Sequence, residues 1–173
     1  MKKGFTMIEL IFVIVILGIL ASVAVPRLAS TREDAEISAT VANLRTLVSD
    51  ASSYYVANGT FKPKGKQANW RDITNVPLRD NSKALVQGTT GANTAAYLSA
   101  SGTNCIKIEL KDRSTTGGTT TPAHIAVTKT GTDKYICQEI QKAEPVKAYL
   151  DSKVPGVEKA GAIALGASAR IYN

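Results

Sequence analysis

The 173-residue chain has few of the side chains on which catalytic and metal centres are built. It holds one histidine, His124, and two cysteines, Cys105 and Cys137, which are too few to fill a tetrahedral zinc site. No serine lies in a G-x-S-x-G elbow, and the two-glycine spacing of Gly161–Gly166 lacks the lysine that completes a phosphate-binding loop. These absences argue against an enzyme and point to no cofactor.

Aromatic side chains are also scarce, at 6% of the sequence with a single tryptophan, so the folded core is expected to be thin. The net charge is +7, and a basic surface can attract polyanions such as DNA or anionic lipid. However, no cluster of lysine and arginine with interleaved aromatic residues marks a nucleic-acid site. The aspartates are too scattered for a calcium loop of the EF-hand type.

The amino terminus carries the most informative pattern. Two lysines and a glycine precede an apolar run that extends to Val25, and one acid, Glu9, lies inside that run. A carboxylate costs about 2.5–3.5 kcal/mol at the middle of a membrane and less near its edge. A plain anchor would gain nothing from this cost, so Glu9 predicts a partner that is met inside the bilayer.

Three other interpretations of this segment are weaker. A secretory signal peptide would be cleaved near Ser22-Val23-Ala24, but an acid so early in its apolar region argues against it. A plain anchor over Leu10–Val25 would fall short of the usual length of about 20 residues. Apolar residues on every side, with Lys2-Lys3 in front, argue against a buried core helix. The mature amino terminus separates these cases, at Phe5, Val25 or Met1.

Lys-Gly followed by Phe-Thr-Met-Ile-Glu and a long apolar helix resembles the class III signal of type IV pilins and pseudopilins. The resemblance implies that a prepilin peptidase cleaves after Gly4 and methylates the new amino terminus at Phe5. It also implies that Glu9 pairs with the amino terminus of a neighbouring subunit in a helical filament. Gly18 and Pro26 lie where many members of the family carry residues that loosen the helix.

After Pro26 the pattern becomes that of an amphipathic helix. Apolar residues recur every three or four positions from Ile37 to Tyr55, which places one stripe along one helix face. Pro26 should kink the helix or loosen its preceding turn, and Asn58-Gly59 should end it. The opposite face is expected to carry polar residues: Glu36, Asn43, Arg45 and Asp50.

The remaining sequence predicts a small antiparallel sheet preceded by a loop that Trp70 anchors. Patterns of apolar residues and short connections favour three strands in a meander, at Cys105–Lys111, His124–Lys129 and Lys134–Ile140. We further expect a short element at Ala95–Ser99, a polar turn over Ser114–Pro122, a helix over Val146–Lys153, a flexible stretch over Gly161–Ser168 and a last strand over Ala169–Tyr172. His124 is expected at the surface.

The two cysteines are expected to form a disulfide, because an exported head would lie in an oxidising compartment. In a simple meander, however, Cys105 and Cys137 would lie on the first and third strands, farther apart than the 7 Å or so that a disulfide allows between Cα atoms. Either Cys105 precedes the regular strand, or the sheet bends there, or the thiols stay free.

Together these elements predict an α+β fold: a long N-terminal helix, half in the membrane and half amphipathic, packed against a small antiparallel β-meander head. The expected parts are a leader peptide, a transmembrane or filament-core helix, an amphipathic helix of the head and a globular β-sheet head. They cover residues 1–4, 5–29, 30–58 and 59–173.

The resemblance implies a structural subunit of a type IV pilus or pseudopilus. Such a subunit would be held in a bacterial inner membrane before assembly and in a periplasmic or extracellular filament afterwards. Its expected partners are the prepilin peptidase and identical or related subunits.

Several alternatives stay open. The filament could serve adhesion, motility, type II secretion or DNA uptake, and the chain could be the major pseudopilin of a secretion or competence machine. Secretion pseudopilins of the family often bind calcium near the carboxyl terminus, but such ligands cannot be mapped onto this sequence. A membrane-tethered binding module, with DNA contact through the basic surface, is an alternative from another class.

Overall fold

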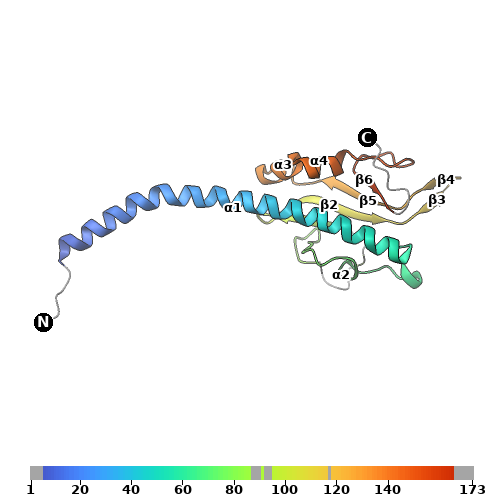
Figure 1. Cartoon of the computed structure of the whole chain (residues 1–173), viewed down its shortest axis with the longest axis horizontal. Coiled ribbons are helices and arrows are strands. Elements are labelled where there is room, and N and C mark those ends of the chain that lie inside the picture. The colour runs from blue at the N-terminus through green and yellow to red at the C-terminus, as the bar shows by residue number, and fades with distance from the viewer. Residues whose placement is uncertain (1–5, 87–90, 92–94, 117, 166–173) are drawn as a thin grey trace. The chain divides into compact units, whose positions relative to one another are not determined.

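The computed structural model describes residues 6–86, 91, 95–116 and 118–165. The chain divides into two compact units, Met1–Ala35 and Glu36–Asn173, and one helix, α1 (Met7–Asn58), contributes to both. The second unit holds the other helices and strands that the structure describes (Figure 1). They are η1 (Pro63–Gly65), α2 (Trp70–Ile73), β1 (Ala96–Ala100), β2 (Thr103–Lys111), β3 (Ser114–Thr116), β4 (Thr119–Thr121), β5 (His124–Lys129), α3 (Tyr135–Lys142), α4 (Glu144–Asp151) and β6 (Ala162–Ala164).

Four strands form an antiparallel sheet in the order β1-β2-β5-β6. Ile108 pairs with Val127 and Leu110 pairs with Ile125, so the apolar residues of β2 and β5 share one face. These four side chains are at most 2% exposed. The two strands predicted at residues 105–111 and 124–129 are confirmed, and the short element predicted near Ala95 is strand β1.

The second half of α1 crosses the sheet and packs into the same core (Figure 1). Leu44, Leu47 and Ala51 are at most 1% exposed, which makes them the best-buried apolar positions of the helix. The predicted stripe is confirmed, and Leu47, which had not been assigned to it, widens it. The helix ends as predicted: Gly59 has φ +69°, and its N–H donates to the carbonyl oxygen of Tyr55 at 2.7 Å.

Two of the polar residues expected opposite the apolar stripe of α1 form hydrogen bonds to loops of the second unit. The Glu36 carboxylate accepts hydrogen bonds from the N–H and the hydroxyl of Ser101, at 2.8 and 2.7 Å. The Asp50 carboxylate accepts the hydroxyl of Thr74 at 2.7 Å. Both acids are half-buried, because they tie the helix to the β1–β2 turn and to the loop after α2.

The loop that follows α1 is anchored by two buried aromatic residues. Phe61 is fully buried between Tyr54 and Tyr55, with ring centroids 6.2 and 5.3 Å away, and its N–H donates to the Asp112 carboxylate at 2.8 Å. Trp70, at 1% exposed, fills the core from α2, as the sequence predicted. Because few aromatic residues are available, the loop is held at these two points.

The predicted strand over Lys134–Ile140 is wrong, because this segment is helix α3. Its buried residues Ile136, Cys137, Ile140 and Gln141 are spaced so that they lie on one helical face. A strand would have buried alternate residues instead. A short apolar segment of this kind fits either period, and packing against the core decides in favour of the helix.

The helix at this position brings the two cysteines together. Cys105 of β2 and Cys137 of α3 form a disulfide with Cα atoms 4.9 Å apart. The predicted bond is confirmed, and the expected distance problem disappears because Cys137 is not on a third strand. Gln141 supports the junction, since its side-chain amide donates to the carbonyl oxygens of Cys105 and Thr130 at 2.9 and 2.7 Å.

Further expectations need correction. The Thr-rich segment predicted as a turn is a small hairpin, β3–β4, because β-branched threonine favours extended backbone. The stretch predicted as flexible contains β6, which pairs with β5. His124 is 7% exposed rather than at the surface, and its Nδ1 lies 2.9 Å from the carbonyl oxygen of Pro122. Helix α4 is confirmed, whereas the strand predicted at 169–172 lies outside the described residues.

Replacing both cysteines by serine should destabilise the second unit. The disulfide closes a loop of sequence separation 32, and the chain-entropy model gives a loss of about 3–4 kcal/mol for a loop of this size. Urea unfolding of the full chain in mild detergent, followed by Trp70 fluorescence, measures it. Reduction of the unsubstituted chain is the matched control and should give the same loss. An unchanged urea midpoint in both samples would contradict the prediction.

Candidate functional site

The amino-terminal end of α1 is closed by a reciprocal pair of hydrogen-bonding residues, Thr6 and Glu9. The N–H and the hydroxyl of Thr6 donate to Oε2 of Glu9 at 2.8 and 2.7 Å, and the N–H of Glu9 points back to the Thr6 hydroxyl at 3.4 Å. This is a capping box, in which a threonine and a glutamate three residues later satisfy donors that the first helical turn leaves open.

The capping box gives Glu9 a role inside its own chain. A carboxylate at a helix amino terminus is also stabilised by the helix dipole. Thr-x-x-Glu before an apolar run was visible in the sequence, but the acid was interpreted there only as a contact for another subunit. Both hydrogen bonds from Thr6 end on Oε2 of Glu9. No described residue donates a hydrogen bond to Oε1.

The helix that follows is apolar and uncovered. Met7–Val25 spans 19 residues with a mean hydropathy of 2.9, which is long and apolar enough to cross a membrane. Its larger apolar side chains are 40–82% exposed. They are Met7, Ile8, Leu10, Ile11, Phe12, Val13, Ile14, Val15, Ile16, Leu17, Ile19, Leu20, Val23 and Val25.

The other predicted site residues of the amino-terminal segment are Gly18 and Pro26, which lie within α1, and Gly4 and Phe5. Gly18 lies within α1, and a Cβ added there would meet no atom within 4 Å. The helix continues through Pro26. Gly4 and Phe5 lie outside the described residues, so the processing junction stays a prediction. The structure thus brings Glu9 to Thr6 and leaves Gly18 with open space around it.

Tyr54 of α1 and Glu109 of β2 have shifted pKa values. Burial raises the pKa of Tyr54, and the charge of Asp72 adds to the shift. Burial also acts to raise the pKa of Glu109, but hydrogen bonds and charges from Lys107 and Lys111 outweigh it and hold that pKa below its usual value. The two lysines lie 3.1 and 3.6 Å from the Glu109 carboxylate on the open face of β2.

Metal binding has no visible basis in the part of the chain that the structure describes. Within it, no group of three or more histidine, cysteine, aspartate or glutamate residues could hold an ion. Both cysteines are joined in the disulfide, and His124 faces a backbone carbonyl.

Comparisons with known proteins agree with the resemblance noted in the sequence. Residues 1–25 match the family model described as the prokaryotic N-terminal methylation motif. The chain is 38% identical over 60 residues to the type II secretion system core protein G of Dickeya chrysanthemi, covering 35% of this chain and 39% of that protein. The same protein of Klebsiella pneumoniae is also 38% identical over 60 residues, with 35% and 43% covered.

A longer match joins the chain to pilins. The type IV major pilin protein PilE1 of Neisseria gonorrhoeae is 32% identical over 109 residues, covering 62% of this chain and 64% of that protein. The chain therefore spans about two fifths of the secretion proteins and just under two thirds of the pilin. No solved structure matches. These matches confirm the resemblance to type IV pilins and pseudopilins.

Removal of the Thr6 hydroxyl should loosen the first turn of α1. A valine keeps the shape of threonine but cannot cap, and loss of a cap costs about 1 kcal/mol, which corresponds to about fivefold faster amide exchange in that turn. Hydrogen exchange of Thr6→Val in detergent micelles measures it. Thr6→Ser, which keeps the hydroxyl, should exchange like the parent, and equal exchange in all three chains would exclude the cap.

Proposed function

We propose that the chain is a structural subunit of a type IV pilus or pseudopilus, cleaved after Gly4 by a prepilin peptidase and assembled into a helical filament. The observation that carries the proposal is the uncovered apolar surface of Met7–Val25. Such a surface is unfavourable in water and is removed either by lipid or by the same segments of neighbouring subunits. In this proposal, lipid covers the apolar helix before assembly, and neighbouring subunits cover it in the filament.

Processing changes the end of this helix. Removal of the leader takes Lys2 and Lys3 away, lowers the net charge from +7 to +5, and leaves a free amino group on Phe5, which the peptidase methylates. Before assembly the subunit is held in the inner membrane by its apolar helix. After assembly the helix lies in the filament core, and the head faces the periplasm or the exterior.

Glu9 serves both as a cap and as the contact between subunits. Its Oε2 is used by Thr6 of the same chain, so Oε1 is the atom offered to the amino group of a neighbouring Phe5. A buried carboxylate without a positive partner is costly. Assembly therefore stops where this pair forms, which sets the axial register of one subunit against the next.

Gly18 and Pro26 prepare the helix for packing in the filament. Glycine lowers helix stability by about 1 kcal/mol relative to alanine, and proline removes a backbone donor. Between these residues the helix can lengthen locally at low cost when subunits pack together. We accordingly assign residues 5–29 to the filament core, 30–58 to the amphipathic helix and 59–173 to the head.

A membrane-tethered module that binds DNA is the second candidate function. The net charge of +7 favours it, and Lys62 and Lys66 are exposed near Phe61. Phe61 is buried, however, and so it offers no ring on which a base could stack. Salt-dependent retention of the full chain on DNA would support this function, and no retention at low salt would count against it.

The choice between a pilus and a secretion or competence pseudopilus depends on the machine that the subunit joins. The similarity to a major pilin covers more of the chain, and the similarity to core protein G is higher in identity over a shorter stretch. Copurification with a particular secretin, ATPase and set of minor pilins decides between them.

Replacing Gly4 by alanine should block maturation, because the peptidase is expected to recognise the glycine before the cleaved bond. The intact mass of the protein purified from membranes gives the result, since an uncleaved chain keeps its first four residues. Gly18→Ala is the matched control and should be cleaved normally, because a Cβ there meets nothing. A Gly4→Ala chain that still begins at Phe5 would argue against this processing site.

Replacing Glu9 by glutamine separates its two roles. Glutamine can still close a capping box but carries no charge, so Glu9→Gln should keep the helix start and lose filaments. Thr6→Val is the converse variant, which loses the cap and keeps the charge, and it should still assemble. Electron microscopy of filaments, together with the intact mass to show normal cleavage, measures both. Normal filaments from Glu9→Gln would restrict Glu9 to capping.

A further inference from the structure

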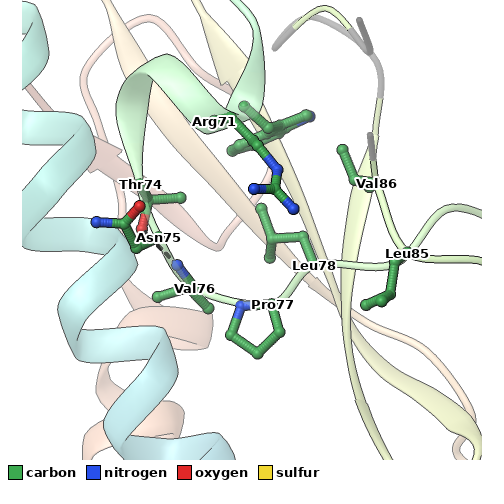
Figure 2. A pocket seen from close by; sticks show the side chains of 9 residues that line it. Arg71, Thr74, Asn75, Val76, Pro77, Leu78, Leu85 and Val86 are labelled. Atoms are coloured by element: carbon green, nitrogen blue, oxygen red, sulfur yellow. Dashed lines mark hydrogen bonds between the residues drawn. The ribbon is translucent and has the colours of Figure 1, made fainter. Parts of the chain in front are cut away.

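The loop between α1 and β1 contains a pocket of about 160 Å³ (Figure 2). Its lining combines buried apolar residues, namely Trp70, Leu78 and Val86, with residues that reach solvent. A cavity of about 150 Å³ with apolar walls can hold one benzene ring. The pocket is therefore of the size that accepts a single aromatic side chain.

The positively charged side chain of Arg71 lines this pocket. The Arg71 guanidinium extends from α2 toward Leu78, and Leu85, 51% exposed, lies across from it (Figure 2). No ion pair joins Arg71 to an acid among the described residues. An arginine in this position attracts both a carboxylate and the face of an aromatic ring. The pocket is thus suited to an aromatic side chain that has an acid close by.

The chain itself presents such a side chain. Within the second unit, the large apolar residues that are exposed in the described part are Val56, Leu85 and Tyr135. Leu85 belongs to the pocket, and Val56 is aliphatic with no acid within two positions. Tyr135 is 66% exposed at the start of α3, and the side chain of Asp133, two residues earlier, is 76% exposed. The Asp133 carboxylate forms an ion pair with Lys134, at 3.9 Å.

We propose that Tyr135 of one copy of the chain docks into the Arg71 pocket of a second copy, with Asp133 facing the guanidinium. This contact between heads deepens the proposed filament function and rests on it. A tyrosine is well suited to the role, because its ring covers the apolar floor while its hydroxyl stays near water.

The pocket and Tyr135 lie at different places on the head, so the contact would build an open chain of copies and not a closed dimer. Within the second unit, α2 and α3 lie on opposite sides of α1 (Figure 1). A pocket on one side and its occupant on the other make a heterologous interface, in which each copy uses both surfaces with different neighbours. Such interfaces generate open helical assemblies unless the rotation happens to close a ring.

A photo-crosslinker at the pocket rim tests the contact. We would replace Leu85 by p-benzoyl-phenylalanine in the full chain, irradiate intact cells, and identify the crosslinked peptides by mass spectrometry. We expect crosslinked dimers that join position 85 of one copy to residues 132–138 of another. Crosslinks to other segments, to a different protein, or none at all would overturn the proposal.

Second substitutions in the same background show which side chains carry the contact. Tyr135→Ala should lower the dimer yield about tenfold, because a docked aromatic anchor contributes strongly, and Tyr135→Phe should nearly restore it. Val56→Ala, which removes an exposed apolar side chain elsewhere, is the matched control and should change nothing. A yield that Tyr135→Ala leaves unchanged counts against docking even if dimers form.

Exchange of the charges gives a second, independent measurement. Arg71→Asp and Asp133→Arg should each lower the dimer yield, and the two together should recover it, whereas Lys62→Asp in the same loop should have little effect. Failure of the double variant to recover would remove Asp133 from the contact and overturn the proposal as stated. Formation of the Cys105–Cys137 disulfide in each variant checks that the head has folded.

Electron microscopy of the same samples separates this contact from the filament function. Filaments without the expected crosslink would overturn the docking and leave the filament proposal standing. If the unsubstituted chain forms no filaments, the filament proposal fails, and the crosslink alone decides whether the heads dock. Dimers joined at the predicted segments would then support docking, and their absence would overturn it.

Discussion

The structure of the head depends on one constraint, the burial of a single stripe of α1 against the apolar face of the sheet. Leu44, Leu47 and Ala51 share their core with Ile108 of β2 and Val127 of β5. The sheet has four strands in the described part of the chain. With few aromatic residues available, it depends on this helix to exclude water from its inner face. The hydrogen bonds from Ser101 to Glu36 and from Thr74 to Asp50 then fix the loops around the packed helix.

The same helix behaves differently in its two halves because its neighbours differ. In the second unit the sheet covers one face of α1, so apolar residues recur there every three or four positions. From Leu10 to Val25 the sequence has no charged residue, and the larger apolar side chains of this stretch are 40–67% exposed. This contrast, more than any single residue, supports the proposal that other molecules cover the first half.

Much of this arrangement could be predicted from the sequence. The helix end at Asn58, strands β2 and β5 and the disulfide follow from periodicity, a left-handed glycine and the expected compartment. Helix α3 could not be predicted, because Tyr135–Lys142 is too short for its period to exclude a strand, and its state is decided by packing across the core. The Thr6–Glu9 capping box could also be predicted, because Thr-x-x-Glu before an apolar run is its sequence pattern. The cost of an acid in lipid favoured a contact with another subunit instead.

The capping box bears on the assembly role that we propose for Glu9. A carboxylate that waited in the membrane with no donor would carry its full penalty in every free subunit. Thr6 supplies two donors to one oxygen of Glu9 and lowers this penalty, and it does so at a helix end where the dipole also favours a negative charge. The remaining oxygen can accept a charged donor without breaking the cap. In the proposed function, the cap lowers the cost of Glu9 in a free subunit, and pairing with a neighbouring amino group lowers it further, so this difference would favour assembly.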